Sequence, residues 1–300
     1  MKKKIRLSTV IMPMIFLIGL GIFLYPRISN YLLVRSQTMV VEHYDYKVKK
    51  LPQEKKQEIK DKTNQYNQSR IESTPSLGKT FGKENQQTKS TDTNAVDDEG
   101  NQVFDVMQAM LGESLGTIEI PKIALVSPIY KGTSEEILQK GVGWLEGSSL
   151  PSGGKGTHTV LTGHRGLPTA ELFTNLPELK KGDQFVITYT DELLAYEVDQ
   201  ILTVKPEETE ALRIDPEKDQ ATLITCTPYM VNSHRLYVRG HRVPYSQEKL
   251  DKARPKKDYS MALIIAGAVL VLFVIAIVIW RRKKLKEELG LKKGSRQADR

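Results

Sequence analysis

The sequence predicts a mainly β domain, folded as an antiparallel or mixed barrel with short helices and flanked by two transmembrane helices. From residue 116 onward, short runs rich in β-branched and aromatic residues alternate with Gly, Pro and Asp turns. These runs follow one another closely, without long crossover helices, which favours a barrel over an alternating α/β fold. Two uncharged apolar segments, 7–25 and 261–280, bracket the region.

Each apolar segment has about the 20 residues that a helix needs to cross the hydrocarbon core of a bilayer. A cleaved signal peptide is the alternative for the first one. A signal peptide usually has a shorter apolar core and ends at a small-residue cleavage site. Tyr25, Pro26 and Arg27 follow segment 7–25 instead. We therefore expect an uncleaved anchor.

The net positive charge of the chain comes from its two ends. The formal net charge is +8, the first six residues carry four Lys or Arg, and residues 281–300 carry nine against three acidic residues. The positive-inside rule then places both termini in the cytoplasm and the long middle region outside the cell. Nucleic-acid binding is not expected, because it would require a basic surface on the folded domain itself.

The segment before the predicted barrel is polar. Its first part is consistent with a solvated helix that breaks at Pro52, its second part with a flexible spacer, and Val103–Leu111 with a short amphipathic helix. The predicted organisation is a cytoplasmic tail (1–6), a membrane anchor (7–25), a polar helical or flexible spacer (26–115), a catalytic domain (116–245), a tether (246–260), a membrane helix (261–280) and a basic cytoplasmic tail (281–300).

Seven strands and two short helices are predicted within residues 116–245. Ser134 is expected to cap one helix, with Glu135 and Glu136 in its first turn, where carboxylates are favoured. The other helix is expected at Leu172–Leu179. The predicted strands are Gly116–Ile120, Ser127–Lys131, His158–Gly163, Gln184–Tyr189, Leu193–Val204, Ala221–Cys226 and Leu236–Val243.

The chain contains a single cysteine, Cys226. A single cysteine cannot form an internal disulfide. Cys226 is therefore a buried residue without a chemical role, a partner in an intermolecular disulfide or a reactive thiol. Cys226 ends an apolar strand, and Pro228 stops that strand. Arg235 follows at the start of the next strand, so a hairpin would bring a fixed cation near the sulfur. By itself, each of these residues has an ordinary structural explanation.

His164 lies between two glycines in Thr-Gly-His-Arg-Gly, directly after a short strand. A thiolate is the nucleophilic form of cysteine, and a neighbouring cation favours it. Histidine can exchange protons with an amine, and arginine can donate hydrogen bonds to a developing oxyanion. On spacing alone, His158, His234 and His241 compete for the imidazole role. We expect no metal and no cofactor, because no metal-binding motif or phosphate-binding loop is present.

These motifs resemble the sortase family, and most closely its class C, the pilin-polymerising sortases of Gram-positive bacteria. The family motif T-L-x-T-C corresponds to Thr222–Cys226, and T-G-H-R-G corresponds to Thr162–Gly166. The wider similarity covers residues 116–245. It is carried by the runs GTIEIPKI (Gly116–Ile123), PIYKGTSEEILQKGVGWLEGSSLP (Pro128–Pro151), VLTGHRGLPTAELFTNL (Val160–Leu176) and TLITCTPYMVNSHRLYVRGHRVPY (Thr222–Tyr245).

The resemblance implies an eight-stranded sortase β-barrel, with Cys226 as nucleophile, His164 as its imidazole partner and Arg235 as the oxyanion-stabilising residue. It also implies that Thr225 helps to bind the substrate. The implied reaction is cleavage of an LPXTG-like C-terminal sorting signal at Thr-Gly through a thioacyl-enzyme. The acyl group then passes to a pilin lysine, or to a cell-wall precursor amine in a housekeeping anchoring enzyme. A membrane-tethered binding domain without catalysis is the remaining alternative.

One expected feature of class C is absent from the sequence. Enzymes of this class commonly carry a lid before the barrel, with an Asp-Pro-aromatic motif. The preceding segment here contains Asp97, Asp98 and Asp105, but none of them begins such a motif. Phe104-Asp105 has the right residue types in the reverse order. We therefore do not expect a standard lid.

Overall fold

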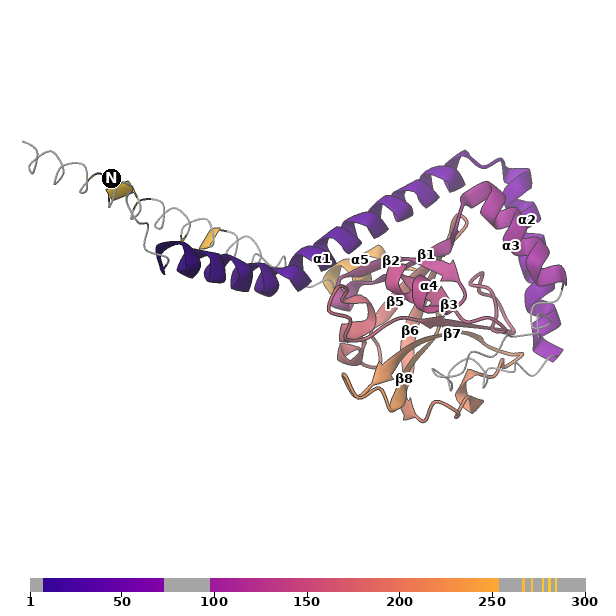
Figure 1. Ribbon diagram of the computed structural model, residues 1–300. Coiled ribbons are helices and arrows are strands. Elements are labelled where there is room, and N and C mark those ends of the chain that lie inside the picture. The colour runs from indigo at the N-terminus through magenta and orange to yellow at the C-terminus, as the bar shows by residue number, and fades with distance from the viewer. Residues whose placement is uncertain are drawn as a thin grey trace, which may run out of the picture. The chain divides into compact units, whose positions relative to one another are not determined.

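The computed structural model describes residues 8–72, 98–253 and a few isolated positions between 266 and 284, and it contains a closed β-barrel (Figure 1). The barrel strands, in chain order, are β1 (Ser114–Ile120), β2 (Leu125–Lys131), β3 (Val142–Trp144), β4 (Thr157–Thr162), β5 (Gln184–Tyr189), β6 (Glu192–Val204), β7 (Asp219–Thr227) and β8 (His234–Val243). They close in the order β1-β2-β3-β4-β7-β8-β6-β5.

The pairing is mixed, as the sequence predicts. β2 and β3 are parallel, and so are β4 and β7, whereas the remaining neighbours are antiparallel. The seven predicted strands are all present, with ends shifted by a few residues at most. The sequence analysis missed β3, which has only three residues and therefore shows no readable alternation.

Helices complete the first of the two compact units into which the chain divides, residues 1–254 and 255–300. Ser134 caps α4 as predicted, its hydroxyl accepting a hydrogen bond from the amide of Ile137. The helix expected at Leu172–Leu179 is a 3₁₀ helix, η3. The helical elements are α1 (Ser8–Lys50), α2 (Gln53–Glu72), α3 (Asp98–Leu111), η2 (Pro121–Ile123), α4 (Glu135–Lys140), η3 (Leu172–Glu178), η4 (Glu210–Leu212) and α5 (Gln247–Ala253).

The described helices of the predicted spacer are not merely solvated. α1 and α2 meet at Pro52, as predicted, but α2 buries Ile59 and Tyr66 in the hydrophobic core, and α1 buries Tyr44. The Tyr44 hydroxyl accepts a hydrogen bond from the amide of Thr190 (2.9 Å) and donates one to Leu115 O (3.3 Å). The expectation of a solvated helix was wrong at these positions, because a few well-spaced side chains are enough to dock a polar helix.

None of the helices in the described ranges combines the length and the hydropathy that a bilayer span requires. The predicted anchor at 7–25 coincides with the first half of α1. The predicted membrane helix at 261–280 lies largely outside the described residues, as do the flexible part of the spacer and most of the two tails.

Candidate active site

Cys226 and Arg235 lie directly opposite each other on neighbouring strands. β7 and β8 are antiparallel, and Cys226 pairs with Arg235 in their register. Residues opposite each other in an antiparallel pair project to the same face, with Cβ atoms about 4.5–5.5 Å apart. The predicted hairpin is therefore confirmed, and the two side chains start from adjacent points on one face of the barrel wall.

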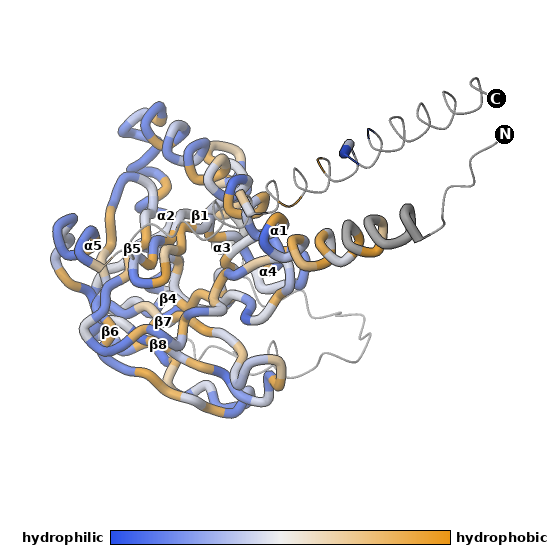
Figure 2. Tube along the Cα trace, turned by 90° about the vertical axis from the view of Figure 1, so that its left-hand side faces the viewer, coloured by the Kyte–Doolittle hydropathy of each residue, from blue (hydrophilic) through white to orange (hydrophobic). Residues whose placement is uncertain are grey.

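The strand on the other side of β7 brings His164 to the same end of the barrel. β4 and β7 are parallel, and their register runs as far as the pair Thr162 and Ile224. It continues for one more hydrogen bond, from the amide of Gly163 to Ile224 O at 3.1 Å. His164 is the next residue, so it lies level with the end of β7, where Cys226 is found. Figure 2 shows β4, β7 and β8 side by side in this order.

The main chain around His164 is held from several sides. The buried hydroxyl of Thr225 donates to Gly163 O at 2.8 Å, and the amide of Phe173 donates to His164 O at 3.0 Å. These bonds link the residue to both β7 and η3. The imidazole itself is partly accessible, with 23% of the side chain exposed, and its Nε2 atom lies 3.0 Å from Oε2 of Glu135. A fixed main chain therefore presents an imidazole that solvent and substrate can reach.

The glycines beside His164 are explained by close packing. A Cβ atom added at Gly163 would lie 2.8 Å from the ring of Phe173. At Gly166 the backbone has φ of +85°, and an added Cβ would lie 2.9 Å from the ring of Tyr229. Any other residue at either position would displace an aromatic ring, and at position 166 it would also strain the backbone.

Two guanidinium groups lie near the end of β7. Nη1 of Arg235 donates to Asn232 O at 3.1 Å and to His234 O at 3.2 Å, which fixes its position over the β7–β8 turn. Nη1 of Arg165 donates to the hydroxyl of Thr227, next to the cysteine, at 2.9 Å. The sequence analysis gave Arg165 no role, although it lies within the Thr-Gly-His-Arg-Gly motif. Fixed cations near a thiol favour its thiolate form.

The competing histidines have other surroundings. His158 is fully buried; its Nδ1 lies 2.9 Å from Arg213 O and its Nε2 lies 2.7 Å from Oγ1 of Thr222. Burial lowers its pKa to about 4, which keeps it neutral. His241 pairs with Gln220, at the opposite end of β7 from Cys226. His234 pairs with Thr227, so its side chain starts on the other face from that of Cys226.

The segment that precedes the barrel contributes to the core in its described part. Phe104 of α3 is 5% exposed, and its ring centroid lies 5.2 Å from that of Trp144. Nζ of Lys131 lies 4.0 Å from the centroid of the same ring. Phe104 is thus a packing residue of α3, whereas the expected lack of a standard lid stays a prediction. Asp97 lies outside the described residues.

A thiol, an imidazole and a guanidinium gathered at the ends of three adjacent strands are the groups that thiol-dependent acyl transfer uses. A model of the sortase domain matches residues 118–243. Sortase D of Bacillus subtilis (strain 168) is 34% identical over 135 residues, which cover 44% of this chain and 65% of that protein. The chain thus spans about two thirds of the length of this curated relative.

Solved structures extend the similarity beyond the barrel. The pilus-related sortase C of Group B Streptococcus is 40% identical, with a TM-score of 0.60 over 68% of this chain and 97% of that one. Sortase C of Streptococcus pneumoniae is 42% identical, with a TM-score of 0.60 over 70% of this chain and 98% of that one. The chain belongs to the sortase family.

Proposed function

We propose that the protein is a cysteine transpeptidase that joins pilin subunits, with Cys226 as nucleophile, His164 as acid and base, and Arg235 as oxyanion-stabilising residue. The observation that carries the proposal is the strand register: β8 places Arg235 opposite Cys226, and β4 delivers His164 to the same barrel end. On this proposal, main-chain hydrogen bonds would position the three groups before any substrate binds.

In the first half of the reaction, the thiolate of Cys226 attacks the carbonyl carbon of the threonine in an LPXTG-like sorting signal. An S–C bond forms, and the carbonyl oxygen takes the negative charge, which the guanidinium of Arg235 stabilises. The Thr–Gly C–N bond then breaks, and His164 gives its proton to the leaving amine of glycine. A thioacyl-enzyme remains.

In the second half, a primary amine attacks the thioester carbonyl. The new C–N bond forms, the S–C bond breaks and the thiolate leaves. The amine gives up a proton to His164, so the imidazolium and the thiolate of the starting state are both restored. The net reaction exchanges one amide bond for another and consumes neither an oxidant nor a nucleotide.

A lysine side chain of a pilin subunit is the proposed acceptor. This choice is supported by the two structural neighbours, of which one is a pilus-related sortase C and the other a sortase C with pilin substrate specificity. An amine of a cell-wall precursor is the alternative acceptor, and it would make the enzyme a housekeeping anchor of surface proteins. Both functions use the same first half-reaction, so only the acceptor separates them.

We also propose that the enzyme is held at the cell membrane by segments 7–25 and 261–280, with the catalytic domain outside and both termini in the cytoplasm. The apolar sequences and the basic ends support this topology. Because Cys226 is the only cysteine, a membrane-impermeant thiol reagent applied to intact protoplasts is expected to label it. Labelling that requires lysis would contradict the topology.

The test of the activity supplies the full chain with a sorting-signal peptide and one of two acceptors, a pilin domain or a short peptide that mimics the cell-wall amine. The parent protein is expected to form a mass-detectable thioacyl adduct and to transfer it preferentially to a pilin lysine. Cys226→Ala is expected to form neither adduct nor product. Product formation by this variant would refute the role of Cys226 as nucleophile. Preferential use of the cell-wall mimic by the parent protein would support the anchoring function instead.

A further inference from the structure

A contact between Glu135 and His164 is not used by the mechanism above. Oε2 of Glu135 lies 3.0 Å from Nε2 of His164. The two residues are 29 positions apart in the sequence, and Glu135 opens α4. We propose that Glu135 is a positioning residue, which holds the imidazole of His164 by one ring nitrogen and leaves the other for proton exchange with the substrate. This inference rests on the proposed function.

Helix α4 is a firm support for that carboxylate. Ser134 caps its first turn through the amide of Ile137. At its other end, Nε2 of Gln37 on α1 donates to Lys140 O at 2.9 Å, and Gln37 is buried. α4 is thus fixed at both ends, once by its own cap and once by a helix from a distant part of the chain. The cap orders the turn that carries Glu135, and the bond from Gln37 anchors the helix at its last residue.

The contact assigns different tasks to the two ring nitrogens. A carboxylate can only accept a hydrogen bond, so Nε2 must keep its hydrogen. The proton that moves to the leaving amine, and later returns from the attacking amine, is then the one on Nδ1. The neutral intermediate is the Nε2–H tautomer, which is the form that Glu135 holds. The same logic applies to the acidic partner of a catalytic histidine in other nucleophilic enzymes.

The exposure of Glu135 limits the size of the expected effect. Its side chain is 60% exposed, so water screens the charge and competes for the hydrogen bond. Glu135 is therefore expected to act by aligning the imidazole of His164, and not through its charge. We expect it to be a small part of the about 10²–10⁴-fold that general acid–base catalysis supplies.

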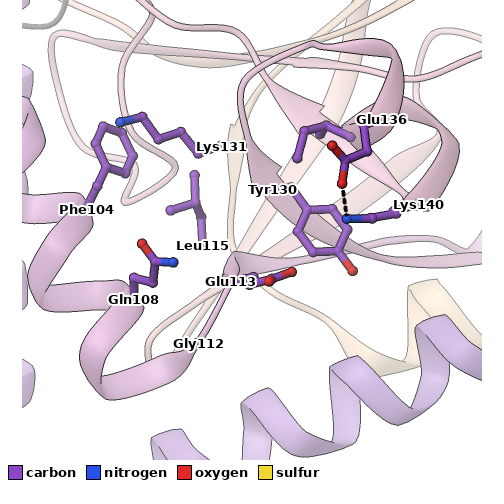
Figure 3. A pocket seen from close by; sticks show the side chains of 10 residues that line it. Phe104, Gln108, Gly112, Glu113, Leu115, Tyr130, Lys131, Glu136 and Lys140 are labelled. Carbon is purple, nitrogen blue, oxygen red and sulfur yellow. Dashed lines mark hydrogen bonds and ion pairs between the residues drawn. The ribbon is translucent and has the colours of Figure 1, made fainter.

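The neighbouring residue offers a matched control. Glu136 occupies the same first turn of α4, but its Oε1 binds Nζ of Lys140 at 2.7 Å (Figure 3). The Glu136 side chain is largely exposed and that of Lys140 is about half exposed, and Glu136 lines a pocket between α3 and α4. Substituting Glu136 removes the same charge from the same helix and leaves the imidazole contact intact.

The experiment compares Glu135→Ala, Glu135→Gln and Glu136→Ala in the full chain, with the sorting-signal peptide and a pilin domain as substrates. Glu135→Ala is expected to lower kcat about tenfold, with KM within about twofold of the parent. Glu135→Gln is expected to recover most of the loss, because its amide oxygen still accepts from Nε2. Glu136→Ala is expected to match the parent. Thermal unfolding should be alike in all three variants.

Two results would overturn the positioning role. One is a kcat for Glu135→Ala equal to that of Glu136→Ala. The other is a rise in kcat, which would mean that Glu135 holds the imidazole away from its working position. Either result leaves the proposed function standing if Cys226→Ala is inactive in the same assay. If the parent itself fails to form a thioacyl adduct, the proposed function fails, and it does so independently of Glu135.

Discussion

Strand β4 has a histidine near each end, and the two side chains have opposite surroundings. His158 is fully buried, and both of its ring nitrogens have protein partners. His164 is partly exposed, and its Nε2 lies within hydrogen-bond distance of a carboxylate oxygen of Glu135. The first imidazole is arranged to stay neutral and fixed, whereas the second can exchange protons with a ligand. Hydrogen bonding and access, rather than residue type, distinguish a structural from a catalytic candidate.

The strongest test of this difference is to substitute each histidine in turn. His164→Ala is expected to lower kcat by about 10²–10⁴-fold, because no group replaces the proton donor. Its unfolding midpoint should stay near that of the parent, since the imidazole is not in the core. His158→Asn should keep kcat within about threefold while losing stability, because Arg213 O keeps a donor but the Thr222 hydroxyl loses its partner. Peptide cleavage and urea unfolding measure the two quantities. The reverse pattern would reassign the catalytic role.

The same contrast extends to two arginines on one face of β8. Arg235 pairs with Cys226, whereas Arg239 pairs with Thr222 and binds Asp199 through two hydrogen bonds of 3.0 and 3.1 Å. Arg235→Lys is expected to lower kcat about 100-fold, because an ammonium cannot reproduce the planar donors that face an oxyanion. Arg239→Lys should change kcat by less than about twofold. Equal rates for the two variants would argue against a special role for Arg235.

The pH dependence of stability tests the burial of His158. The pKa of His158 is lowered from 6.5 to about 4, chiefly by burial. Between these values the unfolded chain binds a proton that the folded chain does not, so acidification favours unfolding. This residue should reduce the free energy of unfolding by at most about 1.4 kcal/mol for each pH unit lost in that window. Denaturant titrations at several pH values in this window should show that the free energy of unfolding depends less steeply on pH in His158→Asn than in the parent. An unchanged slope would mean that other groups dominate.

The smallest expected effect concerns Thr225, whose buried hydroxyl binds Gly163 O beside His164. Thr225→Val should cost about 1 kcal/mol of stability, because it removes this donor. It should also lower kcat about twofold to threefold, with Thr225→Ser as the control that keeps the hydroxyl. The substrate-binding role predicted for Thr225 stays a prediction. A rise in KM with unchanged kcat would favour that role over positioning.

The sequence was most informative where local patterns decide the structure. The apolar and β-branched residues of 221–226, with Pro228 after them, were enough to predict a strand that ends at Cys226, and a hairpin to the next strand was the arrangement that would bring Arg235 near it. The Ser134 cap could be predicted for the same reason, since residues within one turn determine it. The family motifs added the choice among histidines, which spacing alone had left open.

Features that depend on distant contacts could not be predicted. Glu135 was recognised as a first-turn carboxylate, but nothing near it in the sequence indicates that it meets His164. That contact depends on the pairing of β3, which follows α4, with β4, which precedes His164. The docking of α1 was missed because many of its contacts to the rest of the unit are hydrogen bonds, which leave no apolar pattern in the sequence. Asn30, Gln37 and Tyr44 all hydrogen-bond to the barrel unit, and two of these three are not hydrophobic.

The seven-residue spacing of those three positions has a consequence for length variation in α1. Seven residues make about two helical turns, so all three lie along one side of the helix. Inserting one residue between Asn30 and Gln37 would rotate one part of the helix by about 100° relative to the other and separate their contacts. Gln37 holds the end of α4, and Asn30 holds the amide of Glu171 beside η3. Insertions and deletions in α1 should therefore be tolerated chiefly in steps that preserve helical phase.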